Sequence, residues 1–283
     1  MAVDTQNQIW AQQYSANIMQ LAQQKYSKLI NTVYVTPNIV GKNFFQPQIG
    51  AWSMQVKGGR NVATPNNDPA LANRMGTLVD YHDNRLLDRG DELRIIADPR
   101  SAYTIAAASA IGRQIDTEIL SAAIGTAKYG ETGSSSVTQS QIVTTTAGAL
   151  TLAQLADVKK TFDNNDVDEE DRYFIISPAT LSSMLQVTAM TSADYASVKA
   201  LVRGEMDTFM GFKFIQSTLV TSVCGATYSG VAWQKNGVCL GMASSPMVRT
   251  DIRTDLSYSW QIYYELNLGG VRLEEKKVCS AKA

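Results

Sequence analysis

The chain has 283 residues, of which 45% are hydrophobic and 18% are charged. This is the composition of a globular protein, with fewer charges than the ~25% of an average domain. We therefore expect other copies of the chain to cover part of its surface. The 25 Lys and Arg residues balance 26 Asp and Glu residues, giving a formal charge of −1. Such a balance argues against a dedicated nucleic-acid reader, which faces phosphates with an excess of cations.

Several classes of protein are excluded by particular residues. His82 is the single histidine, so a histidine-rich metal site is excluded. Cys224, Cys239 and Cys279 lack C-x-x-C spacing and are typical of reduced, buried thiols in a cytosolic protein. The first ten residues carry no basic residue, so we expect no secretory signal. No apolar stretch approaches the ~20 residues of a membrane helix. The sequence predicts a soluble protein without a membrane partner.

The first third of the chain divides into two predicted segments. Apolar spacing predicts an amphipathic helix over residues 5–30, either an ordinary peripheral helix or a partner-binding arm. Residues 31–95 contain four of the seven prolines and the Gly58–Gly59 pair, which are strong turn signals. Short extended pieces at 51–57 and 77–81 have no periodic apolar face large enough to form a core. An extended two-stranded excursion is the predicted form.

A long helix is predicted over residues 98–125. Asp98 is a good N-cap, Pro99 suits the first helical position and Gly125 suits the C-terminal end. The Gly-, Ser- and Thr-rich stretch 126–147 predicts a loop or weak hairpin. The predicted buried stripe of the helix consists of Ile105, Ala108, Ile111, Ile115, Ile119 and Ala122.

The remainder of the chain predicts an α+β domain followed by a long strand. A capping box, Thr151 to Gln154, opens a helix, and Ser177–Pro178 opens another that runs to Gln186. A further helix is predicted at 193–203, and strands at 173–176, 208–216 and 231–234. Apolar residues alternate over 256–268, which predicts an unusually long half-buried strand. Gly269–Gly270 is expected to end it, and 271–278 to form the last strand.

Motifs for catalysis and ligand binding fail on their spacing. Gly125 and Gly130 have phosphate-loop spacing, but an anionic Glu131 follows where a lysine is needed. The acidic run 163–171 lacks the glycine that a calcium loop needs at its sixth position, and predicts a solvated turn. His82 and Asp83 have no identifiable nucleophile or oxyanion donor. The sequence therefore predicts no catalytic, cofactor-binding or metal-binding residue.

Four segments, in this order and spacing, resemble the major capsid proteins of tailed bacteriophages, whose shell fold is shared with herpesviruses. The end of the long helix, 111–120, is similar to the family's spine helix, with a small residue, an Asp and an aliphatic pair. Residues 174–180 are similar to the strand-to-helix step of the axial domain. Residues 204–217, with Gly211–Phe212, are similar to the loop-to-strand step, and 232–238 to the next strand and turn.

The resemblance implies an α+β tailed-phage capsid shell fold in four parts. These are an N-terminal arm at 1–43, an extended loop at 44–96, a peripheral domain at 97–147 and 247–283, and an axial domain at 148–246. The peripheral domain holds the spine helix and the long strand. The arm reaches the fold within about 40 residues, so any scaffold is expected to be a separate protein.

The implied function is that of a structural subunit and not of an enzyme. Hexamers and pentamers of the chain would form an icosahedral shell around the phage dsDNA, in a virion assembled in the host cytoplasm. Implied partners are a scaffolding protein, a portal and a decoration or cement protein. Lys25, Lys28 and Lys42 predict only non-specific, salt-sensitive contact with packaged DNA. Some family members form Lys–Asn cross-links, but no partner can be matched to Lys57.

Two other readings of the sequence stay open. A bacterial nanocompartment shell of the encapsulin type has the same fold but holds cargo enzymes. A hydrolase that uses His82 belongs to another class and would be a monomer with catalytic turnover.

Overall fold

The computed structural model describes residues 21–88, 100–145, 149–186, 208–243 and 245–283. The chain divides into two compact units. The first unit comprises Met1–Tyr26, Tyr81–Arg113 and Pro246–Leu266. The second unit comprises Ser27–Asp80, Gln114–Ser245 and Asn267–Ala283. Helix α2 and strands β4 and β14 contribute residues to both units, which are described separately below.

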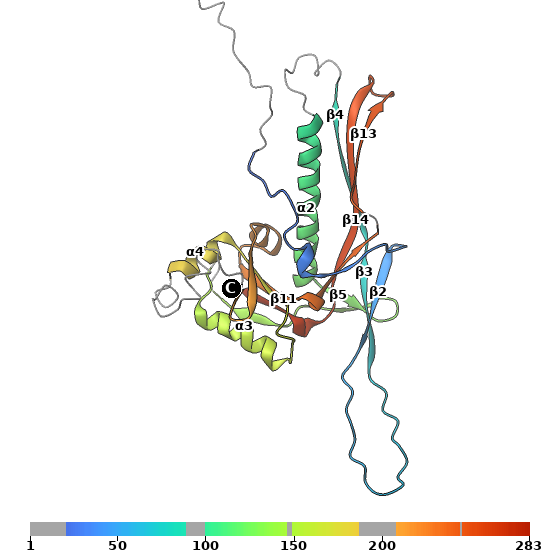
Figure 1. The fold of residues 1–283 in the computed structure, drawn as a ribbon, viewed down its shortest axis with the longest axis vertical. Coiled ribbons are helices and arrows are strands. Elements are labelled where there is room, and N and C mark those ends of the chain that lie inside the picture. The colour runs from blue at the N-terminus through green and yellow to red at the C-terminus, as the bar shows by residue number, and fades with distance from the viewer. Residues whose placement is uncertain (1–20, 89–99, 146–148, 187–207, 244) are drawn as a thin grey trace, which may run out of the picture. The chain divides into compact units, whose positions relative to one another are not determined.

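The first unit contains a long antiparallel strand pair (Figure 1). Strand β13 (Met247–Arg253) pairs with the first half of β14 (Ser259–Arg272), from Met247 opposite Glu265 to Arg253 opposite Ser259. The connecting turn places Ser257 and Tyr258 at positive φ, 52° and 54°. On β4 (Val79–Leu87), the carboxylate of Asp83 accepts a hydrogen bond from the Tyr264 hydroxyl at 2.8 Å.

The predicted long helix is confirmed as α2 (Arg100–Ile124), although the predicted cap at Asp98 lies outside the described residues. Ile111, Ile115 and Ile119 are buried as predicted. The prediction is wrong for Ile105, which is 54% exposed, and for Ala108, which is also exposed. A helix of 25 residues is about 38 Å long. In its N-terminal half Ala107 and Ser109 are buried, so exposed and buried positions alternate there.

The second unit is built on a six-stranded mixed sheet in the order β7-β15-β11-β8-β10-β9. Central β8 pairs parallel with β10 and antiparallel with β11. The helices of this part are α3 (Leu152–Asn164) and α4 (Pro178–Gln186). The strands are β7 (Ile142–Thr144), β8 (Arg172–Ile176), β9 (Thr208–Phe209), β10 (Phe212–Gln216), β11 (Tyr228–Gln234) and β15 (Val278–Lys282).

Local sequence signals account for this part of the fold. The capping box is confirmed: Thr151 Oγ1 accepts from the Gln154 amide, and the Gln154 side chain accepts from the Thr151 amide. Ser177 Oγ accepts from the Thr180 amide at the start of α4, which satisfies one of the helix's free N–H groups. The predicted strand at 173–176 is confirmed by β8. The predicted helix at 193–203 lies outside the described residues.

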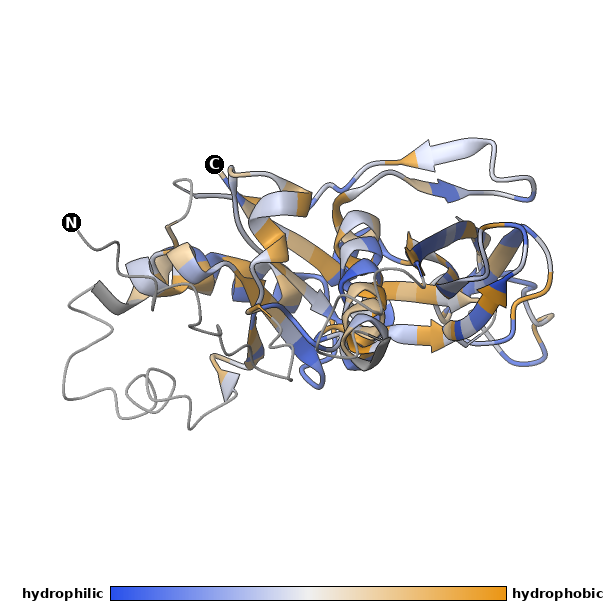
Figure 2. Ribbon diagram, turned by 90° about the horizontal axis from the view of Figure 1, so that it is seen from above, coloured by the Kyte–Doolittle hydropathy of each residue, from blue (hydrophilic) through white to orange (hydrophobic). Residues whose placement is uncertain are grey.

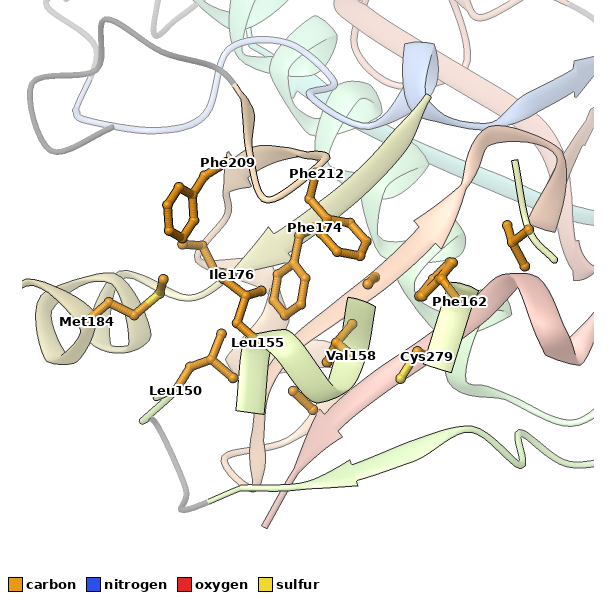
Figure 3. Packing of buried hydrophobic residues seen from close by; sticks show 13 residues of the cluster. Leu150, Leu155, Val158, Phe162, Phe174, Ile176, Met184, Phe209, Phe212 and Cys279 are labelled. Carbon is orange, nitrogen blue, oxygen red and sulfur yellow. The ribbon is translucent and has the colours of Figure 1, made fainter. Parts of the chain in front are cut away.

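The core of this sheet consists of aromatic and aliphatic side chains between α3 and the strands (Figure 3). Leu155 and Val158 on α3 pack with Phe174 and Ile176 of β8. Phe212 meets Phe162 and Phe174 edge-on, with ring centroids 5.5 and 5.9 Å apart. Edge-to-face contacts of this kind add about 0.5–1.5 kcal/mol to the burial energy.

Two smaller sets of strands complete the second unit. Strand β12 (Val238–Met242) pairs with β1 (Tyr34–Thr36) and with the last residues of β14. A four-stranded sheet has the order β2-β3-β5-β6. Its strands are β2 (Asn43–Ile49), β3 (Leu71–Thr77), β5 (Ala127–Tyr129) and β6 (Ser135–Val137), so the predicted weak hairpin within 126–147 is confirmed by β5 and β6. The short 3-10 helices are Ile30–Thr32, Lys235–Gly237 and Glu275–Lys277, and Val220–Cys224 is a π-helix.

The prediction that Gly269–Gly270 ends the long strand is wrong, because β14 continues to Arg272. A Cβ atom at Gly269 would lie 2.1 Å from the Thr77 carbonyl oxygen, and one at Gly270 would lie 2.5 Å from the Ala122 side chain. These glycines permit close packing of the backbone and do not form a turn. The last strand is β15, and the predicted strand at 271–278 is replaced by the end of β14 and a 3-10 helix.

The predicted N-terminal helix is also wrong over residues 21–29, which form bends and coil before the 3-10 helix at Ile30–Thr32. Its residues 5–20 lie outside the described part of the chain. Hydrophobic and hydrophilic residues are interspersed along the helices and strands in Figure 2. None of the helices among the described residues is long and apolar enough to cross a membrane.

Candidate assembly interface

An extended loop leaves the second unit between β2 and β3 (Figure 1). The two strands pair antiparallel from Asn43 opposite Thr77 to Ile49 opposite Leu71, and the Gly50 amide donates to the Ala70 carbonyl at 2.7 Å. We call residues 51–69, beyond this last bond, the loop tip. The predicted two-stranded excursion is confirmed, although its paired strands share only Thr77 with the pieces predicted at 51–57 and 77–81.

The loop tip carries large apolar side chains that face solvent. Trp52 is 72% exposed, Met54 100% and Val56 97%. The three side chains occupy alternate positions of the chain, and we call them the apolar row. Residues 55–58 and 62–65 line an open pocket of about 390 Å³. A row of this kind on a segment without its own core marks an interaction surface.

The base of the loop is held by polar contacts to the C-terminal segment. The Leu273 carbonyl accepts from Gln48 Nε2 at 2.7 Å and from Arg74 Nε at 2.8 Å. Arg74 also forms an ion pair with Glu275 at 2.6 Å, and both side chains are mostly buried. Phe44 of β2 packs in a small apolar cluster near Leu273. The loop is therefore fixed at its base and unsupported at its tip.

Arg272 ties the same segment to the end of α2. Its guanidinium is fully buried and donates to the carbonyls of Ala123 at 3.0 Å, Gly125 at 2.5 Å and Val137 at 3.0 Å. A cation at the C-terminal end of a helix satisfies free carbonyls and the negative end of the helix dipole. Desolvation lowers the pKa of Arg272, and the Glu275 carboxylate opposes this.

The histidine and the glycine pair considered above as candidate sites lie in settings that do not favour catalysis or phosphate binding. His82 is exposed on β4 with its ring 6.5 Å from that of Tyr263, and the neighbouring Asp83 carboxylate is engaged by Tyr264. The Tyr264 hydrogen bond lowers the pKa of Asp83. Gly125 and Gly130 lie after a helix and around strand β5, which is not the setting of a phosphate loop. Within the described residues, no three His, Cys, Asp or Glu side chains come together as metal ligands.

A buried arginine, Arg172, holds the acidic turn after α3 together, and the sequence did not predict this role. Arg172 is 2% exposed and donates to Asp163 at 2.7 Å and to the carbonyls of Val167 and Asp168. Asp168, Glu169 and Glu170 are exposed, as predicted. The available signal was an arginine directly before a fully apolar strand. Such a residue is buried only when its charge is paired and hydrogen-bonded.

The lysines predicted to approach DNA, Lys25, Lys28 and Lys42, are all exposed. The Lys28 ammonium donates to the Gln216 carbonyl at 3.0 Å.

The three cysteines are free and buried, as predicted. Burial raises the pKa of Cys224 and of Cys279 to about 12, so both remain protonated thiols at neutral pH.

Comparison with known proteins identifies the family. The family profile described as "Phage capsid protein" matches residues 6–282, and no curated protein matches the chain in sequence. The capsid of cyanophage P-SCSP1u is similar with a TM-score of 0.77 and 16% identity, covering 98% of this chain and 94% of that one. A structure of Mycobacterium phage Che8 has a TM-score of 0.73 and 15% identity, covering 96% of this chain and 97% of that one. The cyanophage Pam1 capsid has a TM-score of 0.71 and 12% identity, covering 100% of this chain and 99% of that one.

The chain belongs to the phage capsid protein family. It has the tailed-phage capsid fold and is a structural major capsid protein located in the capsid of the virion. The family, the fold and the structural capsid role expected from the sequence resemblance are thereby confirmed. The alternative of an encapsulin-type compartment is not favoured, because the family match and the similar structures are phage capsids.

Proposed function

We propose that the chain assembles as hexamers and pentamers into an icosahedral shell around the phage dsDNA, in the host cytoplasm. The division into an arm at 1–43, a loop at 44–96, a peripheral domain at 97–147 and 247–283, and an axial domain at 148–246 is part of this proposal. The observation that carries it is the apolar row of Trp52, Met54 and Val56 at the loop tip. In a shell built from one repeated chain, the simplest cover for this row is an adjacent subunit.

A triple substitution of the apolar row tests this assignment. Trp52→Ser, Met54→Ser and Val56→Ser together should leave the melting temperature of the unassembled subunit unchanged, because these side chains touch no core. Shell formation should be lost, because apolar contact area between subunits is removed. Val40→Ser is the matched control, since Val40 is 96% exposed but lies outside the loop tip. Normal shells from the triple variant, or lost shells from the control, would contradict the proposal.

The remaining partners are proposed from the family resemblance. They are a separate scaffolding protein, a portal and an optional decoration or cement protein. Contact with packaged DNA through Lys25, Lys28 and Lys42 is proposed to be non-specific, because attraction to phosphate carries no sequence information. A filter-binding series in increasing salt should show weak binding that disappears at high salt. Binding that prefers one base sequence at physiological salt would overturn this assignment. We propose that the subunit has no enzymatic activity.

A further inference from the structure

One buried carboxylate accepts hydrogen bonds from three donors at residues 27–29 of the N-terminal arm. Asp116 lies on α2 and is 0% exposed. Its Oδ1 accepts from Ser27 Oγ at 2.5 Å and from the Leu29 amide at 3.1 Å, and its Oδ2 accepts from the Lys28 amide at 3.0 Å. Two consecutive backbone N–H groups and a hydroxyl converging on one carboxylate form a small anion nest.

Two strands of the second unit, β10 and β11, also hold this segment. Leu29 is fully buried, and its carbonyl accepts from Thr32 Oγ1 at 2.7 Å. The Lys28 ammonium donates to the Gln216 carbonyl on β10 at 3.0 Å. Trp233 Nε1 on β11 donates to the Thr32 carbonyl at 3.1 Å. The chain is therefore fixed from Ser27 onward.

The residues before Ser27 have a different environment. Lys25 and Tyr26 are exposed, Tyr26 by 79%. In the first unit, Arg113 on α2 donates to the side chain of Gln23 at 2.9 Å, and this contact is exposed. From residue 21 onward, Leu29 is the first residue of the described chain that is buried, and its amide donates to Asp116.

We infer that Asp116 is a positioning residue, a latch that fixes residues 27–29 of the N-terminal arm to α2. Its carboxylate is suited to this role because Ser27 Oγ and the Lys28 and Leu29 amides all donate to it. An amide in the same place would present an NH₂ group to at least one of them, whichever way it is turned. The consequence for shells rests on the proposed function, whereas the latch itself does not.

Two adjacent tryptic sites report on the latch directly. The Lys25–Tyr26 bond lies outside it and should be cut in every variant. The Lys28–Leu29 bond lies inside it and requires local opening before it is cut. In the full-length protein, Asp116→Asn should accelerate cleavage after Lys28 about tenfold or more relative to cleavage after Lys25. The melting temperature of the variant should fall only slightly, because the core of the subunit stays folded.

Two further variants keep the test decisive. Ser27→Ala removes one donor without touching the helix, and should give a smaller acceleration in the same direction even if Asp116→Asn does not fold. Glu118→Gln is the matched control, because Glu118 lies on the same helix and accepts from the Gly270 amide at 3.2 Å, an interaction that glutamine can keep. It should leave the ratio of the two cuts unchanged.

The assembly state of the same variants separates the latch from the proposed function. Faster cleavage after Lys28, together with fewer or irregular particles, supports the inference. An unchanged cleavage ratio in both Asp116→Asn and Ser27→Ala would overturn it. Faster cleavage with fully normal shells would overturn the role of the latch in assembly. If the unaltered chain forms no particles, the proposed function fails, while the cleavage ratio still decides whether the latch exists.

Discussion

The guanidinium of Arg74 lies 2.6 Å from the carboxylate of Glu275, so the returning strand of the loop is bound to a segment 201 residues away in the chain. The side chains are only 11% and 18% exposed. A pair removed from water in this way loses more on breaking than an exposed pair, because the partner is left buried and charged. This contact makes the base of the loop part of the second unit's fold.

Arg74→Ala should lower the free energy of unfolding by about 1–3 kcal/mol, since it removes the ion pair and a hydrogen bond to the Leu273 carbonyl. Urea denaturation followed by circular dichroism measures this. Arg60→Ala is the control, because Arg60 is exposed at the loop tip and should change stability by less than about 0.5 kcal/mol. Equal effects of the two substitutions would show that the base is not fixed by Arg74.

Substitutions along α2 should distinguish its two halves. Ile115→Asp places a carboxylate at a site that is 5% exposed, which should cost several kcal/mol and leave little soluble subunit. Ile105→Asp is made at a site that is 54% exposed, and should be tolerated by the unassembled subunit. Soluble yield and melting temperature are the measurements. Comparable losses in both variants would mean that Ile105 is also buried in the subunit.

Gly269→Ala should destabilise the subunit by about 1–3 kcal/mol, because the added Cβ would lie 2.1 Å from a backbone oxygen that cannot rotate away. Gly58→Ala provides the comparison, since a Cβ there meets nothing within 4 Å. Thermal unfolding of both proteins measures the difference. A harmless Gly269→Ala would show that β14 and the Thr77 region are further apart than described.

The buried thiols predict a loss of stability in alkali. Their pKa values are raised to about 12 for Cys224 and Cys279, against ~8.5 in an unfolded chain. The two thiols therefore stay protonated to a higher pH in the folded state than in the unfolded chain. The stability that these thiols contribute is complete below about pH 8.5 and is lost as the pH rises toward 12.

Thiol titration with an aromatic disulfide at pH 8 should find the native cysteines unreactive and all three reactive in denaturant. Cys279→Ala should flatten the fall in stability between pH 8.5 and 11 relative to the unaltered chain. Rapid modification of the native protein at pH 8 would contradict this account.

The sequence was informative where a local rule had no competitor. Thr151 and Gln154 form the predicted capping box, and the run before Ser177 is the predicted buried strand. It was misleading where one pattern has two structural causes. The Gly269–Gly270 pair predicts the end of a strand, but Gly269 allows another backbone to approach closely inside the strand. Ile105 fits the apolar spacing of α2, and that spacing is the same whether this face of the helix is covered or exposed. Periodicity records apolar positions and does not record what covers them.

The candidate interface was predictable only in outline. The turn residues of 58–69 indicate an excursion, but the strands that carry it are defined by pairing over a long separation. Asp116, Arg172 and Arg272 were missed as buried charges, because their partners are mostly backbone groups brought together by the fold. A polar residue within or beside an apolar run was the only signal available for each of them.

Removal of the loop tip tests most directly whether subunits form a shell through the extended loop. Sedimentation and negative-stain microscopy should compare the unaltered chain with a variant in which the loop tip, residues 51–69, is replaced by a short Gly-Ser bridge. The unaltered chain should sediment as large assemblies and show closed, regular particles. The variant should keep the circular dichroism and melting of the unassembled subunit and form no shells. Closed particles from the variant, or its global unfolding, would contradict the account.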